Sequence, residues 1–169
     1  MVEAVSQLPH KNIKIVFVGG APSVEEQARR VAALGMEDRI IFIGNVTDTR
    51  AYVAAGDLGF VLSDSIETVS FACREMMSMG LPMLVSDYAC LPENVTPGEN
   101  GWVVKTGDIA AIKAVVEYAF THRDLLPSMG QKARAQSLRD FDIQDFAAQT
   151  EQVYERANNR SPGHRKPVK

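Results

Sequence analysis

The segment IKIVFVGGAP, residues 13–22, is an apolar, β-branched run that ends at two glycines and a proline. Such a run predicts a buried strand, and glycines directly after it permit a tight turn and a close approach of backbone. Three similar runs follow and predict strands at residues 39–44, 58–62 and 83–86. The chain therefore begins with a repeated strand signal, each copy followed by residues that can form a loop.

Amphipathic segments separate these runs. Ser23 is predicted to cap a helix that stops at Gly35. Further helices are predicted at residues 47–56, 70–79, 109–121, 125–138 and 143–158, with a short strand at 101–104 before the last three. Near-continuous apolar strands that alternate with helices indicate a parallel sheet covered on both faces. We therefore expect an α/β fold, a doubly wound parallel sheet followed by C-terminal helices.

Composition narrows the class of protein. The chain has 169 residues, 46% of them hydrophobic, which suits one domain with a sizeable core; we assign it to residues 1–157 and expect a flexible basic tail at 158–169. Its 18 basic and 21 acidic residues show none of the basic surplus of nucleic-acid-binding proteins, so no nucleic-acid partner is expected. No run approaches the ~18 apolar residues of a membrane span, and we expect a cytoplasmic protein. Its two cysteines have no zinc-ligand spacing, so no metal site is expected.

In a doubly wound sheet, ligands bind beyond the carboxyl ends of the strands, so the loops beginning at Gly19, Gly44, Ser63 and Ser86 should line one cleft. After the third strand, Glu67 and Glu75 flank the start of the predicted helix at 70–79. The amides of that start suit a phosphate oxygen, and a carboxylate beside it can accept hydrogen bonds from a diol. This indicates a nucleotide or sugar phosphate. Spacing alone leaves open that Glu67 only favours the helix dipole and that Glu75 lies on a solvated face.

The order and spacing of several motifs resemble the C-terminal domain of group-one retaining glycosyltransferases with the GT-B fold. The motifs are GGAP at 19–22, RIIFIG at 39–44, Glu67 with Glu75, MMSMGLP at 76–82, LPE at 91–93 and ENG at 99–101. The resemblance covers residues 1–155. It implies a domain that binds a nucleotide-diphosphate sugar donor for retaining transfer, with no metal and no further cofactor. A dinucleotide-binding Rossmann domain fits less well, because residues 19–24 do not satisfy G-x-G-x-x-G.

The resemblance also implies roles for individual residues. Glu67 looks like the catalytic carboxylate near the donor sugar, and Glu75 like the residue that holds the ribose hydroxyls. The remaining donor-binding positions implied by the resemblance are Thr68, Val69, Ser70 and Phe71 at the diphosphate, Gly44, Asn45 and Val46 along the base, and Gly19 and Gly20 facing the cleft.

The chain also departs from the family pattern. Thr68-Val69-Ser70 stands where many members have Gly-Phe-Gly, and Ala89-Cys90 replaces a frequent Gly-Gly. The family's first strand, its N-terminal acceptor domain, and an arginine and a lysine that neutralise the departing diphosphate have no counterpart. We therefore expect the isolated chain to bind donor without useful turnover. The acceptor could be a glycan, a lipid or a small molecule, and a full-length enzyme could lie at the inner face of the membrane.

A non-catalytic reading stays open beside this one. In it the chain is a remnant or an interaction module that forms a homodimer, or binds a partner, through the sheet edge left by the missing strand.

The sequence also predicts the roles of two neighbouring residues on the 70–79 helix. Cys73 should be a buried apolar residue, and Arg74 should form a surface salt bridge.

Overall fold

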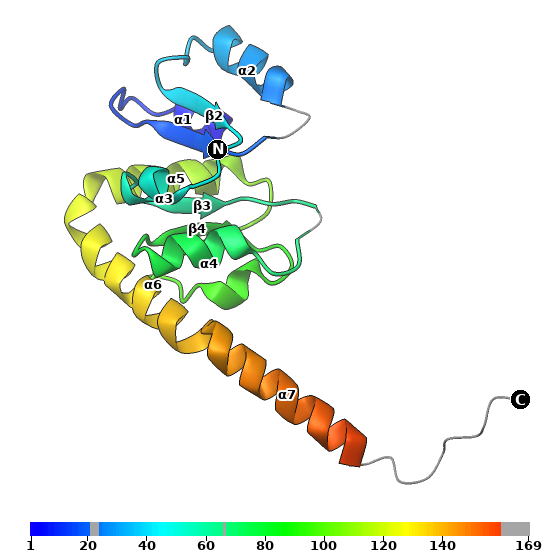
Figure 1. Ribbon diagram of the computed structural model, residues 1–169. Helices are drawn as coiled ribbons and strands as arrows, with labels where there is room; N and C mark the ends of the chain where they lie inside the picture. The colour runs from blue at the N-terminus through cyan, green and yellow to red at the C-terminus, as the bar shows by residue number, and fades with distance from the viewer. Residues whose placement is uncertain (21–23, 66, 160–169) are drawn as a thin grey trace, which may run out of the picture.

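A computed structural model describes residues 1–20, 24–65 and 67–159 (Figure 1). The chain order is α1 (Val2–Ser6), β1 (Ile15–Val18), α2 (Val24–Ala33), β2 (Ile40–Gly44), α3 (Arg50–Ala54), β3 (Gly59–Val61), α4 (Phe71–Ser78), β4 (Met83–Ser86), η1 (Leu91–Asn94), β5 (Gly101–Val104), α5 (Ile109–Thr121), η2 (Arg123–Leu125), α6 (Leu126–Asp140) and α7 (Ile143–Asn159). The predicted α/β alternation with C-terminal helices is confirmed. The predicted cap at Ser23 and residues 160–169 of the predicted tail lie outside the described residues.

The parallel strands form two sheets rather than the single sheet that the sequence predicts. β1 pairs with β2, with Ile15 opposite Ile40, and β3, β4 and β5 pair in that order. β1 and β3 share no hydrogen-bonded ladder. Their only described ring contact is an edge-to-face one between Phe17 and Phe60, whose centroids lie 5.5 Å apart. Within the described chain, the β1–β2 pair therefore stands apart from the β3–β5 sheet.

One apolar core nevertheless runs under both sheets. Val5 of α1, Ile15 of β1, Leu84 of β4 and Val116 of α5 belong to one buried cluster, so α1 and α5 cover the same face. A second cluster lies on the opposite face of the β3–β5 sheet, under α4 and α6; its buried members are Cys73, Met77, Met83, Val85, Leu91, Val95 and Ala133. Fully burying a valine, leucine or methionine side chain contributes about 1.5–3 kcal/mol. The packing is that of a sheet with helices on both faces.

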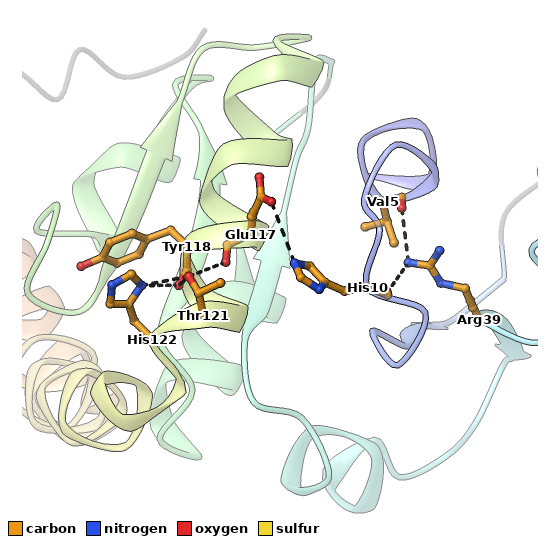
Figure 2. Close-up of polar contacts among 7 residues, drawn as sticks. All are labelled: Val5, His10, Arg39, Glu117, Tyr118, Thr121 and His122. Atoms are coloured by element: carbon orange, nitrogen blue, oxygen red, sulfur yellow. Dashed lines mark hydrogen bonds and ion pairs between the residues drawn. The ribbon is translucent and has the colours of Figure 1, made fainter.

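A buried arginine ties the β1–β2 pair to the rest of the domain (Figure 2). The Arg39 side chain is 8% exposed, and its Nη2 donates to the carbonyl oxygens of Val5, at 3.3 Å, and His10, at 3.0 Å. The His10 ring stacks on Phe120 of α5 at 4.3 Å, and its Nε2 lies 3.9 Å from Oε1 of Glu117. Because a buried cation must be hydrogen-bonded, these carbonyls hold the start of β2 against the α1 connection.

The last helix, α7, extends away from the domain (Figure 1). Its larger apolar side chains Ile143, Phe146, Val153 and Tyr154 are 61–69% exposed. No helix in the described ranges is long and apolar enough to cross a membrane. The apolar face of α7 therefore has no packing partner among the described residues.

Candidate functional site

The loops after β1 and β2 meet, as the sequence predicts for loops at one sheet edge. The amide of Gly19 donates to the carbonyl oxygen of Gly44 at 2.8 Å. Both residues have positive φ, +115° and +77°, a region that favours glycine. A Cβ atom on Gly20 would lie 2.8 Å from side-chain atoms of Asn45. The structure therefore brings Gly19, Gly20, Gly44 and Asn45 together, with a half-buried Val46 beside them.

The loop after β3 positions Glu67 through a short hydrogen-bond chain. Ser63 Oγ donates to Oε2 of Glu67 at 2.9 Å, and Ser86 Oγ donates to the carbonyl oxygen of Ser63 at 2.7 Å. Ser86 is 2% exposed and Glu67 is half-buried. The carboxyl ends of β3 and β4 thus fix one carboxylate at the surface. The sequence marks Ser63 only as bordering the cleft; the link to Glu67 needs the fold of the loop.

The start of α4 is a capped helix terminus. Ser70 is the N-cap, 4% exposed, and its Oγ accepts a hydrogen bond from the amide of Cys73 at 3.4 Å. The amide of Phe71 turns back to the carbonyl of Val69 at 3.0 Å. Among the described residues the amide of Ala72 has no acceptor, so the helix start keeps a free donor and a partial positive charge.

Large apolar side chains surround this polar terminus. Val69 is 43% exposed and Phe71 71% exposed, while Thr68 is exposed beside them. Four residues after Phe71, Glu75 is exposed on α4, and within the described chain its carboxylate has no hydrogen-bond partner. A free carboxylate, free amides and an exposed aromatic ring on one helical turn can receive a ligand that has hydroxyls, an anionic group and an apolar face.

A cavity of about 580 Å³ opens where the loops after β1 and β3 approach each other. Gly19, Gly20 and Ser63 line it, together with Arg30 of α2. Arg30 forms an ion pair with Glu3 at 2.6 Å, and both side chains remain about half exposed. Sequence reasoning missed Arg30, because its place beside the glycine loop depends on how α2 packs. Neither Glu67 nor Glu75 lines this cavity or the smaller one at Thr96, Lys132 and Arg139. A single crevice between the two acids stays a prediction.

The neighbours Cys73 and Arg74 have structural contacts. Burial raises the pKa of the Cys73 thiol to about 12, and the side chain is fully buried, which confirms its predicted apolar role. The predicted surface salt bridge of Arg74 is wrong. Its guanidinium lies 4.0 Å from the ring centroid of Phe141, and its Nε donates to Oδ1 of Asn94 at 3.2 Å. In the described part of the chain, no group of three His, Cys, Asp or Glu residues could hold a metal ion.

Comparisons with known proteins agree with this architecture. The family described as "Glycosyl transferases group 1" matches residues 1–136. The chain is 26% identical over 141 residues to N-acetyl-alpha-D-glucosaminyl L-malate synthase of Bacillus anthracis, covering 83% of this chain and 37% of that protein. It is 30% identical over 132 residues to the lipopolysaccharide core biosynthesis mannosyltransferase LpsB of Rhizobium meliloti strain 1021, covering 77% of this chain and 37% of that protein. The chain thus spans well under half the length of these relatives.

Solved structures share the fold. The Anabaena protein HepE in complex with UDP superposes with a TM-score of 0.84 at 22% identity, over 91% of this chain and 43% of that chain. The C-terminal domain of the group 1 family protein LpcC from Francisella tularensis superposes with a TM-score of 0.74 at 20% identity, over 84% of this chain and 77% of that one. The family match covers most of the chain and the fold is that of half of a GT-B enzyme, so the chain belongs to the group 1 glycosyltransferases.

Proposed function

We propose that this chain is the C-terminal, donor-binding domain of a retaining GT-B glycosyltransferase and that its ligand is a nucleotide-diphosphate sugar. The observation that carries the proposal is the capped start of α4, where free amides stand between a positioned carboxylate, Glu67, and an exposed one, Glu75. The fold likeness to HepE supports it, since HepE structures are described in complex with UDP and with UDP-glucose.

Each group at the start of α4 and in the glycine loop binds a different part of the nucleotide. The free backbone amide of Ala72, at the start of α4, donates to the diphosphate, which the helix dipole also favours. The carboxylate of Glu75 accepts hydrogen bonds from the two ribose hydroxyls, each charge-assisted bond contributing about 1.5–3 kcal/mol. Phe71 adds an apolar surface beside the diphosphate. The loop of Gly44, Asn45 and Val46 lies along the base.

Glu67 belongs to the sugar end of the donor. A carboxylate held by Ser63 presents its remaining lone pairs to the sugar hydroxyls or to the anomeric region, where positive charge grows in an oxocarbenium-like transition state. The departing diphosphate gains negative charge in the same step, and the α4 start opposes that charge without a metal ion. This is the chemistry of retaining transfer on a donor domain.

Useful turnover requires more than these groups. Fixed cations at the leaving diphosphate and a bound acceptor each lower the barrier, and the loss of one such electrostatic donor costs about 10²–10³ in rate. In a full-length enzyme we assign the acceptor, whether glycan, lipid or small molecule, to an N-terminal domain. The 169-residue chain alone binds donor and transfers sugar slowly.

Calorimetric titration with UDP, GDP, ADP and their glucose or mannose derivatives tests the proposal. We expect one diphosphate series to bind, and Glu75→Gln to weaken binding by roughly 10-fold or more, because the substitution removes a charged acceptor from a ribose diol. Glu151→Gln on α7, an equally exposed glutamate far from the site, is the matched control and should bind like the parent. If no nucleotide binds, or if Glu75→Gln binds every one as the parent does, the donor-site assignment is wrong.

One observation favours a second candidate function. The sheet is interrupted between β1 and β3, so an interaction module that pairs with another chain through these edges is chemically reasonable. Light scattering separates the two candidates in part, because a strict monomer with measurable nucleotide affinity favours the donor domain over a homodimer built on the edge.

A further inference from the structure

A fully buried asparagine closes the loop that follows β4. Asn94, at the end of η1, is 1% exposed, and its Nδ2 donates to the carbonyl oxygens of Cys90 at 3.0 Å and Leu91 at 3.2 Å. Its Oδ1 accepts from Nε of Arg74 on α4 at 3.2 Å. The side-chain amide of Asn94 therefore bonds its own loop through the nitrogen and the neighbouring helix through the oxygen.

Arg74 is itself held in place by the end of α6. Its guanidinium carbon lies 4.0 Å from the ring centroid of Phe141, just after α6, the helix that packs beside α4 (Figure 1). Its carbonyl oxygen accepts from Oγ of Ser137 at 3.4 Å. A planar guanidinium held against a ring has few orientations open to its Nε–H group. The direction of the bond from Arg74 to Asn94 is therefore fixed as well.

The loop that ends at η1 begins beside the support of Glu67. β4 ends at Ser86, whose hydroxyl donates to the carbonyl oxygen of Ser63, and Ser63 in turn donates to Glu67. Residues 87–93 therefore start at the support of Glu67 and end at the residue that Arg74 holds. Because ligands bind beyond the carboxyl ends of parallel strands, this loop is placed to form a wall at the sugar end of the proposed donor site.

The groups of α4 that are proposed to bind the nucleotide lie on another side of the helix. Glu75 follows Arg74 directly, and successive residues on an α-helix point about 100° apart. Glu75 is exposed, whereas Arg74 is half-buried. The start of α4 has its own cap, the bond from the amide of Cys73 to Ser70. These groups therefore do not depend on the bond between Arg74 and Asn94.

We propose that Arg74 is a positioning residue, which fixes the loop of residues 87–93 through Asn94 and so gives the donor sugar a preorganised wall beside Glu67. This role rests on the donor binding proposed above. Without the bond to Asn94, the loop has to be ordered when the sugar binds, and that ordering costs affinity. The nucleotide part, at the start of α4 and at Glu75, does not bear this cost. Loss of the Arg74 side chain therefore weakens binding of the sugar and spares binding of the nucleotide.

Arg74→Met tests this role, because methionine keeps a contact with the ring of Phe141 but loses the bond to Asn94. The matched control is Arg134→Met, which removes an arginine that also joins α6 to α4, through the carbonyl oxygen of Ser78. Calorimetry with UDP, GDP, ADP and their glucose or mannose derivatives gives an affinity for the diphosphate and one for its sugar. In Arg74→Met, affinity for the nucleotide sugar should fall roughly 5-fold and affinity for the diphosphate should stay within about twofold. Arg134→Met should leave the ratio of the two affinities unchanged.

Hydrogen exchange tests the effect on the loop without any ligand. The amide of Glu93 donates to the carbonyl oxygen of Cys90 at 3.2 Å, inside the loop that Asn94 closes. Its exchange should be roughly fivefold faster in Arg74→Met than in the parent, because the loop opens more often once its end is released. In Arg134→Met the exchange of Glu93 should match that of the parent.

The outcomes separate this role from the proposed function. Unchanged exchange at Glu93 in Arg74→Met overturns the role, because the loop then does not depend on the bond. An equal fall in affinity for the diphosphate and its sugar also overturns it, since Arg74 would then act on the diphosphate. Faster exchange with an unchanged ratio leaves the bond a purely structural one. In these three cases the parent still binds donor; if it binds no nucleotide at all, the proposed function is wrong and this role with it.

Discussion

Ser63 donates a hydrogen bond to Oε2 of Glu67 at 2.9 Å, and its own carbonyl oxygen is held by the hydroxyl of Ser86 at 2.7 Å. The carboxylate is therefore oriented by the ends of two adjacent strands rather than by its own loop alone. The hydroxyl of Ser63 occupies one oxygen of the Glu67 carboxylate and leaves the other oxygen available to accept a further hydrogen bond. This gives Glu67 a fixed position relative to the start of α4.

We predict that Ser63→Ala weakens binding of the sugar part of the donor more than binding of the nucleotide. The lost hydrogen bond is worth about 1 kcal/mol, so affinity for the nucleotide sugar should fall roughly 5-fold while affinity for the nucleoside diphosphate stays within twofold. Calorimetry on both ligands measures the difference. Ser65→Ala, which removes only an exposed hydroxyl bonded to Asp64, is the control and should change neither. Equal weakening of both ligands by Ser63→Ala would contradict the positioning role.

Much of the fold could be predicted because local signals agreed with it. The predicted helix at 109–121 is confirmed to the residue: Asp108 Oδ1 accepts from the amide of Ala111 at one end, and His122 caps the other. The strands at 83–86 and 101–104 are confirmed in the same way. Here capping residues and uniform apolar runs mark the element ends without any help from tertiary contacts.

Other features could not be predicted because they depend on distant partners. The apolar run that starts at residue 13 forms a strand only from Ile15, and the run at 39–44 pairs only from Ile40. The second start is displaced because the Arg39 side chain turns inward to the connection after α1. The guanidinium of Arg74 lies over the ring of Phe141, at the end of α6. A prediction made from the charges near Arg74 in the sequence therefore named the wrong kind of partner. The separation of the strands into two sheets depends on their order in space. The pattern of apolar residues along the sequence does not contain that order. At the site, the glycine loops and the Ser70 cap followed from residue type, whereas the Ser63–Glu67 bond and Arg30 required the fold.

Ala89 is predicted to be a strained position that glycine relieves. It lies in the loop after β4, and among the described residues it is the one non-glycine residue with a positive φ, +48°. An L-residue pays about 1 kcal/mol or more in this region, so Ala89→Gly should raise the free energy of unfolding by about 0.5–1 kcal/mol in urea titration. Ala114→Gly, at an exposed interior position of α5, should instead lower it by about 1 kcal/mol. Destabilisation by Ala89→Gly would show that the loop conformation does not strain this residue.

Asp87 should make stability depend on pH in the acid range. Its Oδ1 accepts from Oγ1 of Thr106 at 2.8 Å and from the amide of Thr106 at 2.7 Å, and these bonds lower the pKa of the carboxyl below its ordinary 3.8. Because the pKa of Asp87 is lower in the folded protein than in the unfolded chain, its stabilisation is fully present above pH 3.8. The stabilisation is lost as the pH falls through the pKa of the folded protein. Asp87→Asn removes this titration, so its unfolding midpoint in urea should depend less on pH between pH 5 and pH 2.5 than that of the parent. An identical pH dependence in both proteins would contradict the assignment.

Gly130 is predicted to be irreplaceable where α6 crosses the end of α4. A Cβ atom built on Gly130 would collide with the backbone carbonyl of Gly80, and Gly80 itself has φ +85° at the turn that ends α4. Backbone cannot move aside as a flexible side chain can, so Gly130→Ala should lower the free energy of unfolding by about 1–3 kcal/mol despite the better helix propensity of alanine. Gln131→Ala, at the exposed next position of α6, isolates the propensity effect and should be neutral or slightly stabilising. Because this contact also sets the position of α4, and α4 begins at the proposed diphosphate site, Gly130→Ala should weaken nucleotide binding measurably under conditions where the variant is still folded. A variant that unfolds earlier but binds nucleotide like the parent would show that the contact stabilises the fold without positioning the site.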